Sequence, residues 1–361
     1  MKLRSLLKKM TCALILFSSG FPLLWVMQVL PESHVTIRRD NPWNLSDSIN
    51  ETLEDPSPSR TTHILTSISP VQATRSTTTD PCRDRYVTAS PQLDIKPRII
   101  VLAGVGRLGN KMFQYAALLG LAHRHGFTPY VFQNENLAQT FDLSHISPTQ
   151  YSNLPVYFEK AAATYDECLE TMRTDWSWRL GGYYQSWRYF TDIGDIVRKE
   201  FTFKENIRIP VRNYFAQLEA KGKGRPKVGV HIRRGDMGVP STIKQGYTLA
   251  PAEYFHKAMA YFRNRLKDPL FIVCSDDINW SRTHLGSESD VVFAHANQNV
   301  DLATLSSCNH SIISTGTYGW WGAWLAGGET IYYKNFPKNG SWLASQYVAA
   351  DYLPPSWIGM V

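Results

Sequence analysis

The 361-residue sequence contains no D-x-D pair, and its histidines and carboxylates nowhere take the spacing of metal ligands. Asp276-Asp277 is the only Asp-Asp pair, and no third ligand lies near it in the sequence. A divalent metal that bridges a diphosphate is therefore not expected. No C-x-x-C occurs either, which argues against a zinc site and a thioredoxin-like redox motif.

Cysteine is scarce, with five residues in the whole chain. Cys12 lies in an apolar N-terminal run, and Cys82, Cys168, Cys274 and Cys308 are scattered over the rest. These four could form two disulfides in an oxidising compartment, although their spacing does not give the pairing. Buried free thiols are an equally good interpretation for Cys274 and Cys308, which lie in or beside apolar runs.

Charge is missing from residues 10–31, a run long enough to cross a hydrocarbon core of about 30 Å. All charges before this run are basic, and basic flanks of a membrane span tend to stay cytoplasmic. The sequence therefore predicts a cytoplasmic tail (1–9), a signal-anchor helix (10–31) and a lumenal remainder.

Residues 32–95 are rich in Ser, Thr and Pro and lack apolar periodicity, so they cannot bury enough surface to fold. We interpret them as a lumenal stem. Five N-x-S/T triplets are candidate N-glycosylation sites and agree with a secretory-pathway lumen; they begin at Asn44, Asn50, Asn279, Asn309 and Asn339.

From residue 96 onward, strand-like apolar runs alternate with helix-like segments, which predicts an α/β fold with parallel sheets. The Gly- and Lys-rich break at 221–226 separates an N-terminal block (96–225) from a C-terminal block (226–361). We expect the two blocks to face each other across a cleft. The expected strands are 98–102, 129–132, 227–232, 270–274, 291–294, 310–314 and 330–333, and the expected helices are 110–125, one opened by Pro251, 302–307 and 318–325.

The run VGVHIRRGD (228–236) is the strongest local signal, because Arg233 and Arg234 fall at the carboxyl end of an expected strand, where ligands of open α/β sheets bind. Arginine pairs bidentately with phosphate, and the net charge of +7 favours an anionic partner. One arginine could reach a ligand while the other braces the loop. The alternative is a solvated pair with Asp236 as its salt-bridge partner. Nucleic acid is not expected in a lumen.

A second turn, Ser-Thr-Gly-Thr at 314–317, ends an expected strand and begins a helix. Backbone N–H groups and hydroxyls at a helix N-terminus favour anions, although Ser and Thr are also ordinary N-caps. Two such turns in one block favour a site for a phosphorylated ligand. The tryptophans that follow, Trp320, Trp321 and Trp324, are predicted to pack in the core.

VGVHIRRGD resembles the arginine motif of the α1,2-, α1,6- and protein O-fucosyltransferases. Four further stretches resemble the galactoside α1,2-fucosyltransferases more narrowly, and the likeness runs in that family's order over nearly all of 97–360. These stretches are GRLGNKMFQYAALLGLA, GYYQSWRYF, FIVCSDDINW and the block 301–336.

The resemblance implies a GT-B-like fold with two Rossmann-like domains, in a single-pass type II protein of the Golgi membrane. It implies transfer of L-fucose from GDP-β-L-fucose to O2 of a terminal β-galactose, with inversion and without a metal or other cofactor. It makes 96–225 the acceptor-side block and 226–361 the donor-binding block, and it assigns the diphosphate to Arg233 and Arg234, with His231 and Asp236 shaping that loop. Deprotonation of the galactose hydroxyl would need a base such as His231 or Asp236, and the sequence does not choose between them. Donor binding is also expected from Asn309, Ser314, Thr315, Gly316 and Thr317.

The turn Gly104-x-Gly106-x-x-Gly109 has the spacing of a dinucleotide-binding fingerprint. However, the first acidic residue after it is Glu135, farther on than such a fingerprint requires. We therefore expect the turn to bring the N-terminal block to the cleft rather than to bind NAD. Candidates on this side for contact with donor or acceptor are Asn110, Lys111, Gln114, Tyr183, Gln185 and Trp187.

Three other functions stay open. An α1,6- or protein O-fucosyltransferase would share the arginines but not the block 301–336. An NAD-dependent oxidoreductase would use the glycine-rich turn, and a non-catalytic membrane-anchored lectin would bind galactosides without GDP.

Overall fold

The computed structural model describes residues 82, 86–87, 98–133, 135–222 and 224–361. The predicted cytoplasmic tail and signal-anchor, almost all of the stem, Asn44 and Asn50 lie outside the described residues. Within the described part of the chain, no helix is both long enough and apolar enough to cross a bilayer.

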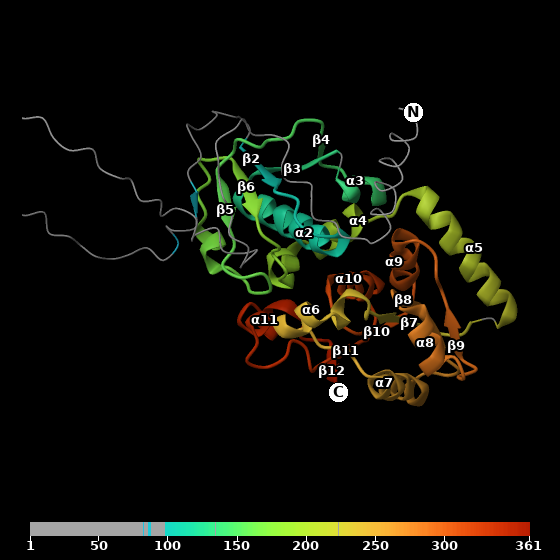
Figure 1. Ribbon diagram of the computed structural model, residues 1–361. Helices are drawn as coiled ribbons and strands as arrows, with labels where there is room; N and C mark the ends of the chain where they lie inside the picture. Colours follow the sequence, from blue (N-terminus) through green and yellow to red (C-terminus); the bar gives the residue numbers. More distant parts are fainter. Residues whose placement is uncertain (1–81, 83–85, 88–97, 134, 223) are drawn as a thin grey trace, which may run out of the picture. The chain divides into compact units, whose positions relative to one another are not determined.

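The first of two sheets has the strand order β1-β5-β6-β2-β3-β4, and Figure 1 labels its strands β2 to β6. Both sheets belong to the unit formed by residues 76–361. β1 runs antiparallel to β5, and the other pairs are parallel. Its strands are β1 (Tyr86–Val87), β2 (Ile99–Leu102), β3 (Thr128–Phe132), β4 (Ile146–Ser147), β5 (Val156–Phe158) and β6 (Trp178–Gly181). Its helices are α2 (Leu108–His125), α3 (Asn136–Thr140), α4 (Gly194–Glu200) and the 3-10 helices Glu167–Thr171 and Trp187–Ile193.

The second sheet is parallel throughout, in the order β9-β8-β7-β10-β11-β12. This is the strand order of doubly wound folds, and the chain reverses direction across the sheet between β7 and β10. The strands are β7 (Lys227–Ile232), β8 (Leu270–Ser275), β9 (Val291–Phe293), β10 (His310–Ile313), β11 (Thr330–Tyr333) and β12 (Ile358–Met360). The helices from here on are α5 (Glu205–Lys221), α6 (Pro240–Gln245), α7 (Ala252–Arg265), α8 (Ile278–Leu285), α9 (Gln298–Ser306), α10 (Thr317–Ala326), α11 (Trp342–Ser345) and α12 (Ala349–Tyr352), with a 3-10 turn at Asp236–Gly238.

Hydrophobic patterning explains the layers of the second sheet. Every residue of β8 is buried, as expected for a central parallel strand that is covered on both faces. On α7 the apolar residues recur at helical spacing, and the stripe that they form is buried under the sheet: Tyr254, Phe255, Ala258, Met259 and Phe262.

Helix α10 links the two sheets through a shared core. Trp320 and Trp321 are fully buried, and their ring centroids lie 4.5 and 5.0 Å from that of Phe113 on α2. Trp324 is partly buried against the same cluster. The predicted core role of the three tryptophans is confirmed. The boundary between blocks at residue 225 stays a prediction.

Cys82, in the predicted stem, and Cys168, on the first sheet's side, form a disulfide. Cys274 and Cys308 are free and buried. Of the two interpretations left open for Cys274 and Cys308, the structure therefore supports buried thiols.

Candidate active site

The two anion-favouring turns meet where the strand order of the second sheet reverses. β7 and β10 are neighbours, with His231 opposite Ile313. The backbone N–H of Arg233 donates to Ser314 Oγ at 2.9 Å, and the N–H of Ser314 donates to the His231 carbonyl at 3.0 Å. Ligands of doubly wound sheets bind at such a reversal, beyond the carboxyl ends of the strands.

Residues from both sheets line a pocket of about 430 Å³ at this point. Its volume lies within the range of roughly 300–1,000 Å³ that is typical of ligand sites. The lining residues are Gly106, Arg107, Leu108, Gly109 and Asn110 from the glycine-rich turn and α2, together with His231, Arg233, Asp236, Cys274, Ser275, Asp276, His295, Gln298, Asp301, Thr317 and Tyr318 from the second sheet's side.

Two helices, α2 and α10, begin at the pocket. Neither has an acidic residue in its first turn, and neither N-cap residue makes a side-chain capping bond. Their first N–H groups therefore leave partial positive charge facing the pocket. The helices come so close that a β-carbon on Gly109 would lie 2.7 Å from Thr317 Oγ1 and 2.8 Å from Tyr318 N. The last glycine of the turn thus permits a helix–helix contact.

Arg233 lies in the pocket and is held by Asp236. Its Nε and Nη2 donate to the two carboxylate oxygens at 3.2 and 2.9 Å. Arg107, from the glycine-rich turn, reaches the same carboxylate at 3.3 Å. Burial opposes ionisation of Asp236, but the hydrogen bond and charge of Arg233, helped by Arg107, outweigh burial and lower its pKa. One carboxylate therefore holds two guanidinium groups beside the pocket.

Arg234 points elsewhere. Its guanidinium lies 3.8 Å from the ring centroid of Trp280, and its Nη1 donates to the Ala250 carbonyl at 3.2 Å. Its backbone N–H donates to Asp276 Oδ1 at 2.8 Å. The structure thus brings Arg233 but not Arg234 into the pocket, because the two side chains leave the strand end in different directions.

His231 is buried in the pocket wall with its ring beside Tyr318, at 5.2 Å between centroids. Its Nδ1 has no hydrogen-bond partner among the described residues, and a β-carbon on Gly319 would lie 2.3 Å from that atom. Burial, with the positive charge of Arg233 adding to it, lowers the pKa of His231 to about 3. The imidazole is therefore neutral at physiological pH.

Among the candidates on the first sheet's side, Asn110 reaches the pocket and connects the two sides. Its Oδ1 accepts hydrogen bonds from Thr317 Oγ1 at 2.8 Å and from Gln185 Nε2 at 3.1 Å. Gln185 therefore lies one contact away from the pocket.

The other candidates on that side have structural partners. Lys111 forms an ion pair with Glu135, and fully buried Gln114 bonds both backbone groups of Val105, which holds the glycine-rich turn in place. Trp187 Nε1 donates to the Ala350 carbonyl at 3.0 Å, and the Tyr183 N–H donates to the Glu159 carboxylate.

The expected position of Asn309 at the donor pocket is wrong. Asn309 precedes β10, at the opposite end of that strand from Ser314, and its Oδ1 accepts from the Lys227 N–H at 2.9 Å. In the turn itself, Ser314 and Thr315 are buried, Gly316 lies against the Arg233 guanidinium, and Thr317 lines the pocket.

Several pocket residues were missed from the sequence: Arg107, Cys274, Ser275, Asp276, His295, Gln298, Asp301 and Tyr318. Ser275 is the last residue of β8 and Asp276 follows it, so the strand-end rule could have found them. Burial raises the pKa of Asp301, although a hydrogen bond from the Ala296 N–H and the charge of His295 oppose the rise.

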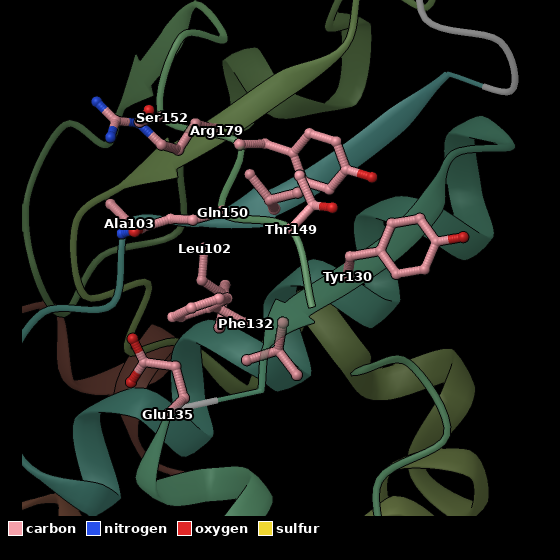
Figure 2. Close-up of a pocket in the computed structure, with 12 residues that line it drawn as sticks. Leu102, Ala103, Tyr130, Phe132, Glu135, Thr149, Gln150, Ser152 and Arg179 are labelled. Carbon is pink, nitrogen blue, oxygen red and sulfur yellow. The ribbon is translucent and has the colours of Figure 1, made fainter. Parts of the chain in front are cut away.

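A much smaller pocket, of about 50 Å³, lies at the first sheet and tests the dinucleotide interpretation (Figure 2). Glu135, which would be the ribose-binding acid, lines it after β3, but its carboxylate is paired with Lys111 and lies against Gly104. A cavity of this size holds a few water molecules and no nucleoside. The geometry does not favour NAD.

Within the described residues, no three His, Cys, Asp or Glu side chains gather to hold a metal ion. Metal-independent chemistry stays a prediction. Asn279, Asn309 and Asn339 are exposed, so their side chains are accessible for the predicted glycosylation.

A family model described as glycosyl transferase family 11 matches residues 86–361. The galactoside alpha-(1,2)-fucosyltransferase 1 of Bos taurus is 34% identical to this chain over 267 residues, which cover 71% of this chain and 74% of the bovine protein. The Homo sapiens protein of the same name is 33% identical, with 71% and 73% covered.

Among solved structures, a mutant of Arabidopsis thaliana FUT1 in complex with GDP is similar at a TM-score of 0.48 and 11% identity, with 69% of this chain and 72% of that chain covered. This similarity is too loose to carry a functional inference. The family match and the identity to the curated relatives carry the assignment: the chain belongs to glycosyl transferase family 11.

Proposed function

We propose that the protein transfers L-fucose from GDP-β-L-fucose to O2 of terminal β-galactose, with inversion at the fucosyl carbon and on a GT-B-like fold. Membership of the family, and the galactoside alpha-(1,2)-fucosyltransferases among the relatives, support this reaction. The observation that carries the proposal is the pocket at the reversal between β7 and β10, where Arg233 and two uncapped helix N-termini converge.

The pocket suits a diphosphate leaving group. When the bond between fucosyl C1 and the phosphate oxygen breaks, its electron pair leaves with GDP and negative charge grows on the phosphate. Arg233 and the first N–H groups of α10 would stabilise that charge, and a group of this kind typically contributes a few kcal/mol. Asp236 would keep Arg233 oriented until the diphosphate accepts its hydrogen bonds.

Neither candidate base is strong. His231 has a pKa of about 3, and Asp236 is engaged by two arginines, so each has little affinity for the proton of the galactose hydroxyl. This supports a displacement in which the donor bond is largely broken before the acceptor oxygen bonds to the opposite face of C1. The hydroxyl proton passes to a water molecule of the solvent as the new bond forms.

We also propose that the protein is a single-pass type II protein of the Golgi membrane with a lumenal catalytic part. The uncharged run 10–31, its basic N-terminal flank and the Ser/Thr/Pro-rich stem support this location. The disulfide between Cys82 and Cys168 agrees with an oxidising lumen.

A transfer assay with radiolabelled GDP-fucose tests the reaction. The full-length protein in detergent would be offered lactose, an N-glycan core and a folded peptide module as acceptors, and the product linkage would be read by an α1,2-specific fucosidase. We expect labelled product on lactose that the fucosidase releases. Transfer only to the core or the peptide would favour an α1,6- or protein O-fucosyltransferase, and galactoside binding without any transfer would favour a lectin.

A further inference from the structure

A second surface lies at the turn Ser314–Gly316, and its lining residues differ from those of the pocket of about 430 Å³, called here the nucleotide pocket after the proposed donor. Here Ser314, Thr315 and Gly316 line a narrow cavity of about 20 Å³ together with aromatic residues that include Phe336 and Tyr347. Gly316 lies in direct contact with Arg233, which lines the nucleotide pocket, because a β-carbon on Gly316 would lie 2.6 Å from Arg233 Nη1. The cavity has room for about one water molecule, so a sugar would lie over the rings and not inside.

Three aromatic rings, Tyr247, Phe336 and Tyr347, form a continuous group at this surface, called here the aromatic group. The ring centroids of Tyr247 and Phe336 are 5.9 Å apart, and those of Phe336 and Tyr347 are 6.0 Å apart. All three side chains are half-buried. The hydroxyls of Tyr247 and Tyr347 make no hydrogen bond to any residue in the described part of the chain.

The aromatic group adjoins the loop 233–236, because Gly316 lines the narrow cavity together with Phe336 and Tyr347 and lies against the Arg233 guanidinium. Burial raises the pKa of Tyr247, while the charge of Arg233 opposes the rise and that of Asp236 adds to it. Tyr247 in turn adds to the raised pKa of Tyr183, which follows β6 of the first sheet. The contact of Gly316 with Arg233 therefore places the group beside Arg233, and charge couples its Tyr247 to Tyr183 on the first sheet's side.

Its backbone links to the first sheet's side are direct. Ala163 N donates to the Gln346 carbonyl at 3.0 Å, and Val348 N donates to the Ala163 carbonyl at 2.9 Å, so Tyr347 is paired with Ala163. The neighbouring Ala162 carbonyl accepts from Gln185 N at 2.9 Å, and Gln185 contacts Asn110. One continuous wall thus runs from Asn110 in the nucleotide pocket to Tyr347.

We propose that the aromatic group is the acceptor subsite, where Tyr247 and Tyr347 bind the apolar face and hydroxyls of a terminal β-galactoside next to Arg233. The inference rests on the proposed function, which supplies the acceptor class. Half-buried rings with free hydroxyls suit a sugar, because they offer both a flat apolar face and hydrogen-bond partners. The donor and acceptor would then meet at Arg233.

The test compares Tyr247→Ala, Tyr247→Phe and Tyr347→Ala in the full-length protein. We expect both alanine variants to raise the KM for lactose roughly tenfold and Tyr247→Phe to raise it less, since the ring remains. The KM for GDP-fucose and the slow hydrolysis of GDP-fucose without acceptor should stay unchanged. Tyr261→Ala is the matched control, because Tyr261 is a half-buried tyrosine on α7 whose hydroxyl bonds Glu329 at 2.6 Å, and it should leave both constants unchanged.

An unchanged lactose KM in both alanine variants would overturn the subsite, as would a rise confined to the donor KM. Calorimetric binding of GDP verifies that each variant is folded. If the wild type hydrolyses GDP-fucose but transfers to no galactoside, the proposed function fails. Calorimetry with lactose in the presence of GDP then still decides the subsite: weaker binding by Tyr247→Ala than by Tyr261→Ala supports it, and equal binding overturns it.

Discussion

The carboxyl edges of the two sheets differ in what fills them. At the first sheet, the chain's own carboxylates take the available donors: Glu135 pairs with Lys111, and Glu159 accepts the N–H groups of Tyr183 and Tyr184. At the second sheet, Arg233 and the uncapped start of α10 face a pocket of about 430 Å³.

The difference shows that parallel strands with loops at their carboxyl ends form an anion site in one sheet and not in the other. Both sheets place loops at the carboxyl ends of parallel strands, where ligands of such folds bind. Only where the cationic groups stay available to a ligand does an anion site result. Arg233 forms an ion pair with Asp236, but the side chain of Asp236 is 38% exposed at the edge of the pocket. A diphosphate can therefore compete with Asp236 for the Arg233 guanidinium.

The largest expected effect comes from removing the guanidinium that the second sheet supplies. Arg233→Ala should lower kcat/KM for GDP-fucose by roughly 10²–10³, because the leaving diphosphate loses its nearest cation. Arg107→Ala should cost about tenfold or less, since Arg107 is 78% exposed and well screened. Steady-state kinetics on both variants measures the two losses in kcat/KM. Equal losses would contradict the comparison, because the glycine-rich turn would then contribute as much to donor use as Arg233 does.

Gly109→Ala tests the contact between the two helix N-termini. The added methyl would meet Thr317 Oγ1 and Tyr318 N, so α2 and α10 must separate. We expect a loss of about 1–3 kcal/mol in unfolding free energy and a raised donor KM, measured by thermal unfolding and kinetics. Gly194→Ala is the control, because a β-carbon on Gly194 would lie no closer than 3.9 Å to Trp324, which is ordinary van der Waals contact. If Gly109→Ala and Gly194→Ala have the same unfolding free energy and the same donor KM, the contact between α2 and α10 is not needed for stability or donor binding.

The buried imidazole of His231 should make stability depend on pH. Its folded pKa of about 3 lies below the ordinary value of 6.5, so the unfolded chain binds more protons between these values. Stability should therefore rise with pH through that window and fall as the solution becomes more acidic. His231→Gln should flatten the dependence of unfolding free energy by about 1.4 kcal/mol per pH unit between pH 4 and 6. Parallel curves for the two proteins would mean that His231 is not neutral when folded.

The smallest effect is expected at the first sheet's edge. Lys111→Met would leave Glu135 unpaired in a partly buried place and should cost about 1 kcal/mol of stability. The donor KM should not change, because Lys111 contacts Glu135 and not the nucleotide pocket. Chemical denaturation and kinetics measure the two effects, and a large rise in the donor KM would show that this edge also serves the donor.

The sequence predicted the second sheet better than the first. β7 and β11 have the expected bounds, because each is a clean apolar run between turn residues. β5, β6 and β12 were missed, since each has only three or four residues and is held by pairing with a distant strand. Helix α5 was missed because Pro210 interrupts its pattern.

The place of a site residue was predictable where it depended only on the carboxyl end of one strand. Arg233 and Thr317 follow directly from the strand-end rule, and the structure brings both to the pocket. The direction of Arg234 was not predictable, because it depends on Trp280 and Ala250 in other elements. The same holds for Lys111 and Gln114, whose partners are set by the tertiary fold.

Calorimetric titration with GDP tests most directly whether the second sheet's edge binds the donor. The full-length wild type, Arg233→Ala and Lys111→Met would be titrated under identical salt conditions. We predict that Arg233→Ala weakens GDP binding by roughly a hundredfold, while Lys111→Met binds like the wild type. A folded Arg233→Ala protein whose Kd for GDP stays within about twofold of the wild type would contradict the account.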